Sequence, residues 1–189
     1  MTQDKAPRKH QNIAKAVKKG LIIVNTGNGK GKSTAAFGTA VRAMGCGHKV
    51  AIVQFIKGKW ATGEVKFFNS LGGQCKVFTI GDGFTWDTKN FAEDVKTAER
   101  AWKKCVEILH DKTHWLVIFD EINYAMKYNF LNAADVIAEL KKKPALKHVI
   151  LTGGGATEEL IALADLVTEM KCIKHPYDHG IMAQAGIEY

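Results

Sequence analysis

Short apolar runs alternate with amphipathic segments along most of the chain. Five runs have the length and β-branched or aromatic content of buried strands, and a sixth, 166–170, is a weaker candidate. The five are 21–24, 48–55, 75–80, 115–119 and 149–151. Apolar residues three and four positions apart, together with Gly and Pro stops, predict helices at 33–44, 64–71, 91–111, 132–143 and 158–163.

This alternation of strands and helices predicts the class of fold. Strands that are apolar on both faces belong to a sheet that is covered on both sides, and helices between them favour parallel pairing. We therefore expect an α/β fold with a mainly parallel sheet and helices on both faces. No repeat or linker interrupts the pattern, so one domain is expected over 20–189, after an N-terminal arm at 1–19.

Composition narrows the class further. Of the 189 residues, 46% are hydrophobic and 24% are charged. This composition excludes a disordered, a collagen-like and a coiled-coil chain. No apolar run approaches the roughly 18 residues of a membrane span, and the N-terminus has no apolar signal stretch. The four cysteines lack the spacing of a zinc site or a disulfide framework. We expect a cytoplasmic protein with reduced cysteines and no membrane partner.

The positive charge is concentrated in the N-terminal arm. The formal net charge is +8, and the segment 1–19 contributes six basic residues against one acid, or +5 of that total. The body is only mildly basic, which weakens the case for a DNA-binding face, and nucleic acid is not expected as a partner. The arm is expected to be mobile, and it either meets an anionic ligand or is a solvated tail.

A glycine-rich turn follows the first predicted strand and opens the first predicted helix. It reads TGNGKGKST over 26–34 and ends like a Walker A loop, although Thr26 stands where the usual first glycine falls. Glycines let backbone N–H groups converge on phosphate oxygens, and the helix dipole and a lysine add positive charge. Lys32 is the predicted phosphate lysine, Ser33 a Mg²⁺ (or Mn²⁺) ligand and Lys30 an extra cation. The predicted nucleotide-binding residues of the loop are Gly27, Asn28, Gly29, Lys30, Gly31, Lys32, Ser33 and Thr34. The alternative is a turn that binds nothing.

Two acids close the apolar run at 115–119. Asp120 and Glu121 have the position of a Walker B carboxylate, which emerges at the carboxyl edge of the sheet near Mg²⁺. The alternative is a pair of acids that caps the next helix. The loop and acids together predict a nucleotide site, but γ-phosphoryl transfer, hydrolysis and displacement of the whole triphosphate all need the same charge neutralisation. The reaction stays open on these residues alone.

Five segments, taken together, resemble one family. The loop TGNGKGK, QFIKG at 54–58, GFTW at 83–86, and the two longer runs 118–131 and 174–189 are similar to the ATP:corrinoid adenosyltransferases. The resemblance extends from Gly20 to Tyr189. It implies a RecA-like P-loop fold, a homodimer, and transfer of the 5′-deoxyadenosyl group of ATP to the Co(I) of cobalamin or cobyrinic acid a,c-diamide, with release of triphosphate. It also implies a reduced flavoprotein or similar electron donor.

The resemblance assigns roles to particular residues. It implies Lys32 and Glu121 as catalytic groups, with Glu121 and Ser33 on Mg²⁺ and Asp120 as a further metal candidate. It gives Arg42 a place beside the nucleotide, where a surface position is the alternative. It places Phe84 and Trp86 against the lower face of the corrin, where they displace the axial ligand of cobalt; packing in the core is the alternative. It also implies that the triphosphate lies on the loop in reversed polarity, so that C5′ faces the corrinoid, and that the basic arm folds over the corrinoid.

One motif departs from the family. The chain has Thr-Gly-Gly-Gly at 152–155, where the family usually has Thr-Gly-Arg-Gly, so a guanidinium expected near the nucleotide is missing at Gly154. We expect Lys30 or Arg42 to replace part of that charge. Two other functions remain as alternatives: a RecA-like nucleoside kinase or NTPase, and a non-catalytic protein that binds corrinoid or nucleic acid.

Overall fold

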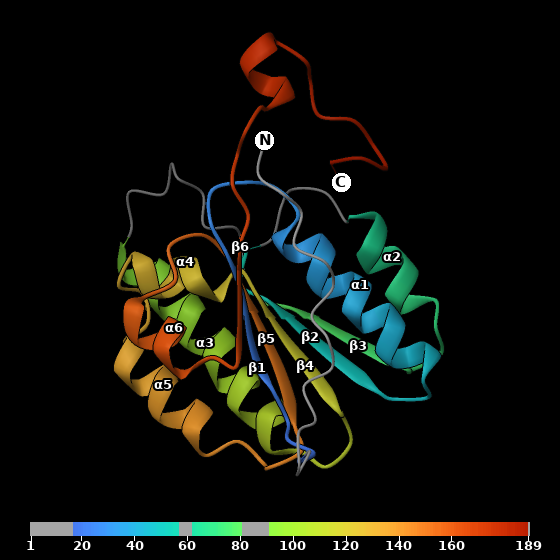
Figure 1. Cartoon of the computed structure of the whole chain (residues 1–189), viewed down its shortest axis with the longest axis vertical. Coiled ribbons are helices and arrows are strands. Elements are labelled where there is room, and N and C mark those ends of the chain that lie inside the picture. The colour runs from blue at the N-terminus through green and yellow to red at the C-terminus, as the bar shows by residue number, and fades with distance from the viewer. Residues whose placement is uncertain (1–16, 57–61, 81–90, 189) are drawn as a thin grey trace, which may run out of the picture.

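Six strands form one sheet in the order β3-β2-β4-β5-β1-β6, and every neighbouring pair is parallel. The structure is a computed structural model that describes residues 17–56, 62–80 and 91–188 (Figure 1). The strands are β1 (Ile22–Thr26), β2 (Val50–Gln54), β3 (Cys75–Thr79), β4 (Leu116–Asp120), β5 (His148–Thr152) and β6 (Leu166–Glu169). The helices are α1 (Lys32–Gly45), α2 (Gly63–Asn69), α3 (Phe91–His110), α4 (Ile122–Lys127), α5 (Ala133–Lys141), α6 (Glu158–Leu163) and the 3₁₀ helix η1 (Pro176–His179).

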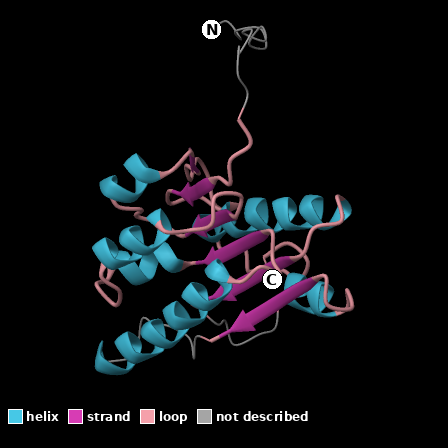
Figure 2. Ribbon diagram, turned by 90° about the horizontal axis from the view of Figure 1, so that it is seen from below, coloured by secondary structure: helices cyan, strands magenta, loops and turns pink. Residues whose placement is uncertain are grey.

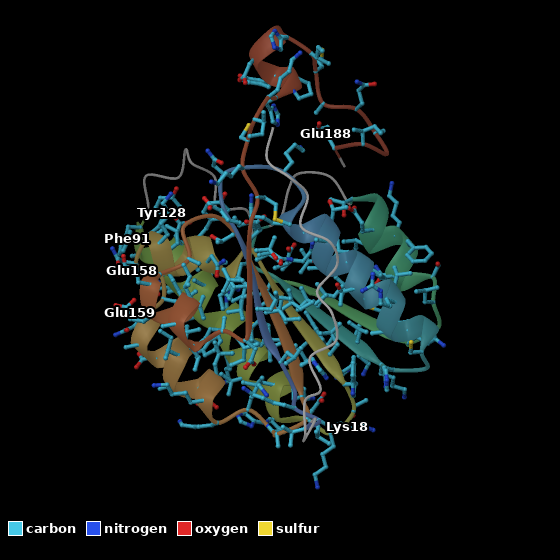
Figure 3. The ribbon with its side chains drawn as sticks, in the orientation of Figure 1. Lys18, Phe91, Tyr128, Glu158, Glu159 and Glu188 are labelled. Atoms are coloured by element: carbon cyan, nitrogen blue, oxygen red, sulfur yellow. The ribbon has the colours of Figure 1, made fainter. Side chains whose placement is uncertain are left out.

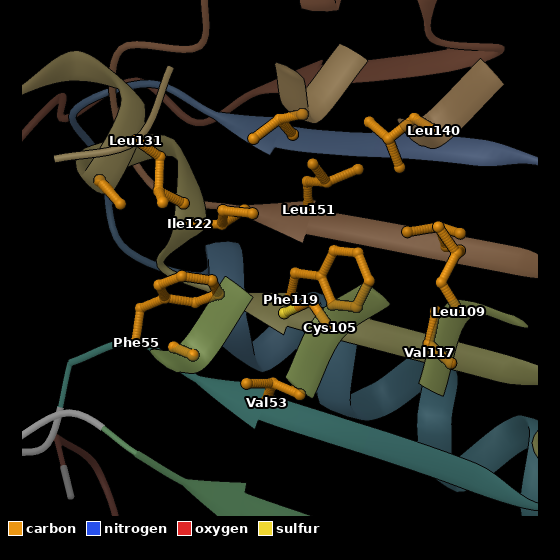
Figure 4. Close-up of a cluster of buried hydrophobic side chains, with 14 of the residues drawn as sticks. Val53, Phe55, Cys105, Leu109, Val117, Phe119, Ile122, Leu131, Leu140 and Leu151 are labelled. Atoms are coloured by element: carbon orange, nitrogen blue, oxygen red, sulfur yellow. The ribbon is translucent and has the colours of Figure 1, made fainter. Parts of the chain in front are cut away.

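Apolar side chains fill both faces of this sheet, as the continuous apolar strands predict. Along β4, Val117 and Phe119 belong to a core cluster shared with α3, α4, α5 and α6, whereas Leu116 and Ile118 belong to a second cluster shared with α1 and α2. Figure 2 shows helices on the two sides of the sheet, and Figure 4 shows the larger cluster around Phe119. The predicted parallel α/β architecture with two covered faces is therefore confirmed. Among the described residues no helix combines the length and apolar character needed to cross a bilayer.

Most predicted elements lie within two residues of the observed ones; the short 3₁₀ helix η1 is not predicted, and neither is α4. It follows β4 directly, and its preceding residue, Glu121, has a left-handed backbone (φ 66°) and makes no side-chain capping bond. The usual start signal of a helix, a short polar residue that accepts a bond from the first turn, is therefore missing. The apolar residues Ile122, Ala125 and Met126 are buried and continue the core below the strand end.

Polar residues close several strands at the same edge of the sheet. Asn25 and Thr26 end β1, and Gln54, Asp120 and Thr152 end β2, β4 and β5; all five are buried. Because parallel strands bring their carboxyl ends to one edge, these side chains gather where ligands bind in open α/β sheets. The fold thus positions a polar site above an otherwise apolar sheet.

Candidate functional site

The phosphate loop joins β1 to α1, and one of its carbonyl groups accepts a hydrogen bond from the side chain of Lys32. Gly27 and Gly31 have φ of 98° and 104°, a left-handed conformation that favours glycine. The Lys32 side chain is buried, and its Nζ donates to the carbonyl oxygen of Gly29 at 2.6 Å. Asn25 Nδ2 donates to the Lys32 carbonyl at 3.1 Å, which ties the end of β1 to the first turn of α1. The loop therefore holds a cation at the amino end of a helix, where anions are favoured.

Asp120 is held by residues from the two strands beside β4. Its Oδ1 accepts from the Thr152 hydroxyl at 2.8 Å, and its Oδ2 accepts from Gln54 Nε2 at 3.3 Å. Burial raises the pKa of the Asp120 carboxyl, and hydrogen bonding with Ser33, Thr152 and Gln54 opposes that shift. Both oxygens are thus engaged inside the protein, which makes Asp120 a group that organises the site.

Glu121 differs from Asp120, because one of its carboxylate oxygens has no hydrogen-bond partner among the described residues. Its backbone N–H donates to Thr152 Oγ1 at 2.9 Å, and its Oε1 lies 3.4 Å from the Ser33 hydroxyl. Its Oε2 is buried and has no hydrogen-bond partner among the residues described. Burial, followed by the neighbouring charge of Asp120, raises the pKa of Glu121 to about 7. A left-handed backbone at a non-glycine residue costs about 1–3 kcal/mol, so the site stores strain at this position.

The loop and the acids border one cavity of about 430 Å³. It is lined by Lys30, Gly31, Lys32, Ser33, Thr34, Phe37, Gln54, Ile56, Thr62, Glu64, Asp120, Glu121, Tyr124, Ile187 and Glu188. Seven predicted residues are brought together here: Lys30 to Thr34, Asp120 and Glu121. Sequence reasoning did not identify Gln54, Tyr124 or Glu188. Gln54 was detectable as a polar residue that closes an apolar strand, whereas nothing in the local pattern points to Glu188.

Three predicted loop residues, Gly27, Asn28 and Gly29, are not among the residues that line this cavity, and they lie against the chain that follows β6. The N–H of Gly29 donates to the Met170 carbonyl at 2.7 Å, and Asn28 Oδ1 accepts from the Cys172 N–H at 3.1 Å. A Cβ on Gly27 would lie 2.3 Å from the Met170 carbonyl oxygen. These glycines therefore allow a close approach of backbone to backbone. The expected convergence of loop N–H groups on phosphate does not include Gly29 in this structure.

The remaining predicted residues lie elsewhere. Arg42 is exposed in the last turn of α1, ten residues beyond Lys32, which corresponds to about 15 Å along the helix axis. The chain does not bring it to the phosphate loop. Phe84 and Trp86, and the basic arm up to residue 16, lie outside the described residues. Of the two substitutes for the missing guanidinium, only Lys30 lines the cavity.

The glycine at the position of that guanidinium is buried against α4 and the loop. A Cβ on Gly154 would lie 2.9 Å from the Tyr124 hydroxyl and 3.2 Å from the carbonyl oxygen of Gly27. A larger side chain at 154 must therefore displace Tyr124, which lines the cavity. The Tyr124 ring takes up part of the space beside the loop that a longer residue at 154 requires.

We expect Gly29→Ala to destabilise the protein and to weaken ATP binding. The new Cβ would lie 2.7–2.9 Å from backbone atoms of Lys171 and Met170, and backbone cannot yield by changing a rotamer. Overpacking of this kind costs about 1–3 kcal/mol. Urea unfolding and calorimetric titration with ATP measure the two effects.

Gly38→Ala is the matched control for that variant. Gly38 lies inside α1, and a Cβ there would have no neighbour within 4 Å among the described residues. Alanine in a helix interior raises stability by about 0.5–1 kcal/mol relative to glycine. A Gly29→Ala protein as stable as Gly38→Ala would show that the close contact with 170–171 has no energetic weight.

Comparisons with known proteins identify the family of the chain. The family model "ATP:corrinoid adenosyltransferase BtuR/CobO/CobP" matches residues 18–189. A corrinoid adenosyltransferase of Sinorhizobium sp. is 49% identical over 191 residues, covering 100% of this chain and 89% of its own. The corrinoid adenosyltransferase of Pseudomonas aeruginosa is 44% identical over 171 residues, covering 90% of this chain and 84% of its own.

Solved structures support the class of fold. The crystal structure of the flagellar accessory protein FlaH from Methanocaldococcus jannaschii aligns with a TM-score of 0.53 and 16% sequence identity, covering 81% of this chain and 72% of FlaH. At that identity the likeness concerns the fold alone, and it agrees with a P-loop, RecA-like sheet. The family match over nearly the whole chain, the relatives at 44–49% identity and the lysine-and-carboxylate cavity lead to one conclusion. The chain belongs to the ATP:corrinoid adenosyltransferase family, whose substrates are ATP and a corrinoid.

Proposed function

We propose that the cavity binds the triphosphate of ATP against residues 30–34 and that triphosphate leaves as the 5′-deoxyadenosyl group moves to Co(I) of the corrinoid. The observation that carries this proposal is that one cavity is lined by a buried lysine, Lys32, and by a carboxylate, Glu121, whose buried Oε2 has no hydrogen-bond partner among the described residues. The lysine suits the charge that develops on the departing triphosphate. The attacking Co(I) carries no proton, so the reaction needs no general base.

The residues of the site fit a bound Mg²⁺. Glu121 Oε2 is a buried carboxylate oxygen without a partner among the described residues, and the Ser33 hydroxyl lies 3.4 Å from the other oxygen. Carboxylate and hydroxyl oxygens are the ligands that Mg²⁺ takes beside nucleotide phosphates. We assign Ser33 and Glu121 as the residues that hold it, with Asp120 fixing the strand end behind them. The ion supplies charge neutralisation for the phosphates when bound.

The protein's own groups then act by position and charge. Lys32 is set at the start of α1, so its amine can exchange the Gly29 carbonyl for a phosphate oxygen. Thr152 links Asp120 to the backbone of Glu121 and so fixes the carboxylate relative to Ser33. Because the reaction needs no general base, the main contribution of position is to hold C5′ of ATP in line with cobalt. The chain supplies that alignment by anchoring the triphosphate.

An anaerobic assay tests the proposal directly. Purified protein is mixed with MgATP and chemically reduced cob(I)alamin, and the visible spectrum and the phosphate products are followed together. We expect a light-sensitive alkyl-cobalt spectrum and one triphosphate per cobalt alkylated. Formation of ADP or orthophosphate without a spectral change would instead favour the kinase or NTPase alternative on the same fold.

We propose Phe84 and Trp86 as the residues that contact the corrin and remove the axial ligand of cobalt. Loss of that electron donor makes Co(II) easier to reduce, because axial ligands set the potential of a bound metal. Phe84→Ala and Trp86→Ala should therefore lose more activity with Co(II) and a protein reductant than with chemically prepared Co(I). Phe67→Ala, at an exposed position of α2, is the control. Equal losses with both cobalt states would contradict the activating role.

The remaining proposals concern assembly and location. We propose a homodimer, supported by apolar side chains that are largely exposed on the segment after β6, including Ile173 at 89% and Met182 at 84%. Light scattering at micromolar concentration tests it.

We further propose a reduced flavoprotein as electron donor. We also propose a cytoplasmic location, which suits an enzyme that consumes ATP.

A further inference from the structure

The chain after β6 contacts the phosphate loop at two separated places. Met170 and Cys172 bind the outer side of the loop through Gly29 and Asn28, as described above. The segment then leads through η1, which stands away from the sheet (Figure 1), and returns to the cavity at Ile187 and Glu188. Residues 170–188 thus form a strap that is attached to the loop at both ends.

At the returning end, the Glu188 carboxylate is paired with the Lys30 amine. The Lys30 side chain is 52% exposed, but that of Glu188 is only 16% exposed. Figure 3 shows Glu188 on the last part of the strap, beside the top of α1 and α2. The carboxylate is therefore a covered part of the cavity wall, held against a lysine of the phosphate loop.

The charges around this pair are unfavourable for a polyanion. Of the described residues that line the cavity, Lys30 and Lys32 are basic, whereas Glu64, Asp120, Glu121 and Glu188 are acidic. Asp120 is engaged by Thr152 and Gln54, and Glu121 belongs to the assigned metal site. Of the other two acids, Glu64 and Glu188, it is Glu188 that forms an ion pair with a lysine of the loop. A phosphate oxygen that reaches Lys30 meets Glu188 at the same amine, and two anions at one site repel each other.

We propose that Glu188 is a built-in competitor of the triphosphate: its carboxylate shares Lys30 with the phosphate chain, lowers affinity for triphosphate and promotes release of the product. This inference rests on the proposed function, because it assumes that triphosphate occupies the loop. It gives Lys30 a different role from Lys32. Lys32 stabilises the charge that develops on the departing triphosphate. The Lys30 amine instead contacts either the phosphate chain or the Glu188 carboxylate of the strap.

Calorimetric titration of the whole protein with tripolyphosphate and Mg²⁺ tests the competition. Glu188→Gln keeps the shape of the side chain and removes its charge. We expect affinity for tripolyphosphate to rise about two- to fivefold, the range for an ion pair whose lysine is in contact with solvent. The gain should shrink at high salt. Adenosine, which lacks phosphates, should bind wild type and variant equally.

Two further variants separate competition from other effects. Glu99→Gln removes the same charge from an exposed position of α3 and should leave affinity unchanged. In a Lys30→Gln background, the gain from Glu188→Gln should fall by at least half, because the shared amine is gone. In turnover, Glu188→Gln should show stronger product inhibition by triphosphate.

These experiments distinguish failure of the proposed competition from failure of the proposed function. If wild-type protein does not bind tripolyphosphate, the phosphate-loop assignment and the competition both fall. If wild type binds and Glu188→Gln binds equally or more weakly, the competition is overturned and the proposed function stands. Weaker binding by the variant would mean that Glu188 orients Lys30 for the phosphate.

Discussion

Replacing Lys32 with alanine should lower kcat/KM by about a hundred- to a thousandfold and leave the fold intact. Removal of one preorganised group that stabilises developing charge costs about 3–4 kcal/mol in comparable sites. The amine is buried at the start of α1, where few water molecules can replace it. Its contribution to folding is small by comparison, since among the described residues Nζ makes one hydrogen bond, to the Gly29 carbonyl at 2.6 Å.

The measurement is steady-state turnover with cob(I)alamin, together with circular dichroism and urea unfolding. Lys76→Ala removes an equal charge from an exposed position of β3 and serves as the control, with activity expected to match wild type. Lys30→Ala should lie between the two, because that side chain is half exposed and already paired. Near-normal turnover by Lys32→Ala would remove the phosphate loop from the mechanism.

The contrast between the two lysines shows what sequence alone can predict. Both belong to one glycine-rich loop, and the position of Lys32 at the start of a helix follows from strand, turn and helix signals that are local in the chain. The pairing of Lys30 with Glu188 joins residues 158 positions apart. No periodicity or spacing encodes such a contact. The sequence therefore predicts Lys30 as an extra cation of the site but does not predict its partner Glu188.

The same distinction applies to the carboxylates. Asp120 and Glu121 were predicted together at the end of β4, and the structure brings both to the cavity. Their division of labour depends on Thr152 of β5, which accepts from the backbone of Glu121 and donates to Asp120. That arrangement requires the register between β4 and β5, which is a tertiary property. Polar residues that end apolar strands are the available signal, and they would have singled out Gln54 and Thr152.

The glycines of the phosphate loop also show a limit of prediction from sequence. The sequence predicts that the first part of the loop binds phosphate, but Gly27 and Gly29 lie against Met170 and Lys171. A glycine allows a close approach to the backbone, but the sequence does not show whether a ligand or another segment of the chain makes that approach. In this chain part of the glycine requirement arises from the continuation of β6.

Glu121→Gln should abolish most activity and leave the protein as stable as wild type or more so. The amide keeps the size of the side chain but replaces the carboxylate that we assign to Mg²⁺. We therefore expect kcat/KM to fall at least a hundredfold and the Mg²⁺ concentration for half-maximal turnover to rise. Stability should not fall, because an ionised carboxylate buried beside Asp120 is unfavourable, as the rise in the pKa of Glu121 to about 7 indicates.

Opposite signs for activity and stability are what separate a functional acid from a structural one. Urea unfolding at pH 8, where the wild-type carboxyl is ionised, and turnover across a Mg²⁺ series measure the two effects. Glu99→Gln, on the exposed side of α3, is expected to change neither. A Glu121→Gln protein that loses stability and keeps its Mg²⁺ dependence would mean that the buried oxygen supports the fold and that the metal lies elsewhere. The strained backbone at Glu121 (φ 66°) and its unpartnered oxygen are consistent instead with a residue kept for its chemistry at the expense of stability.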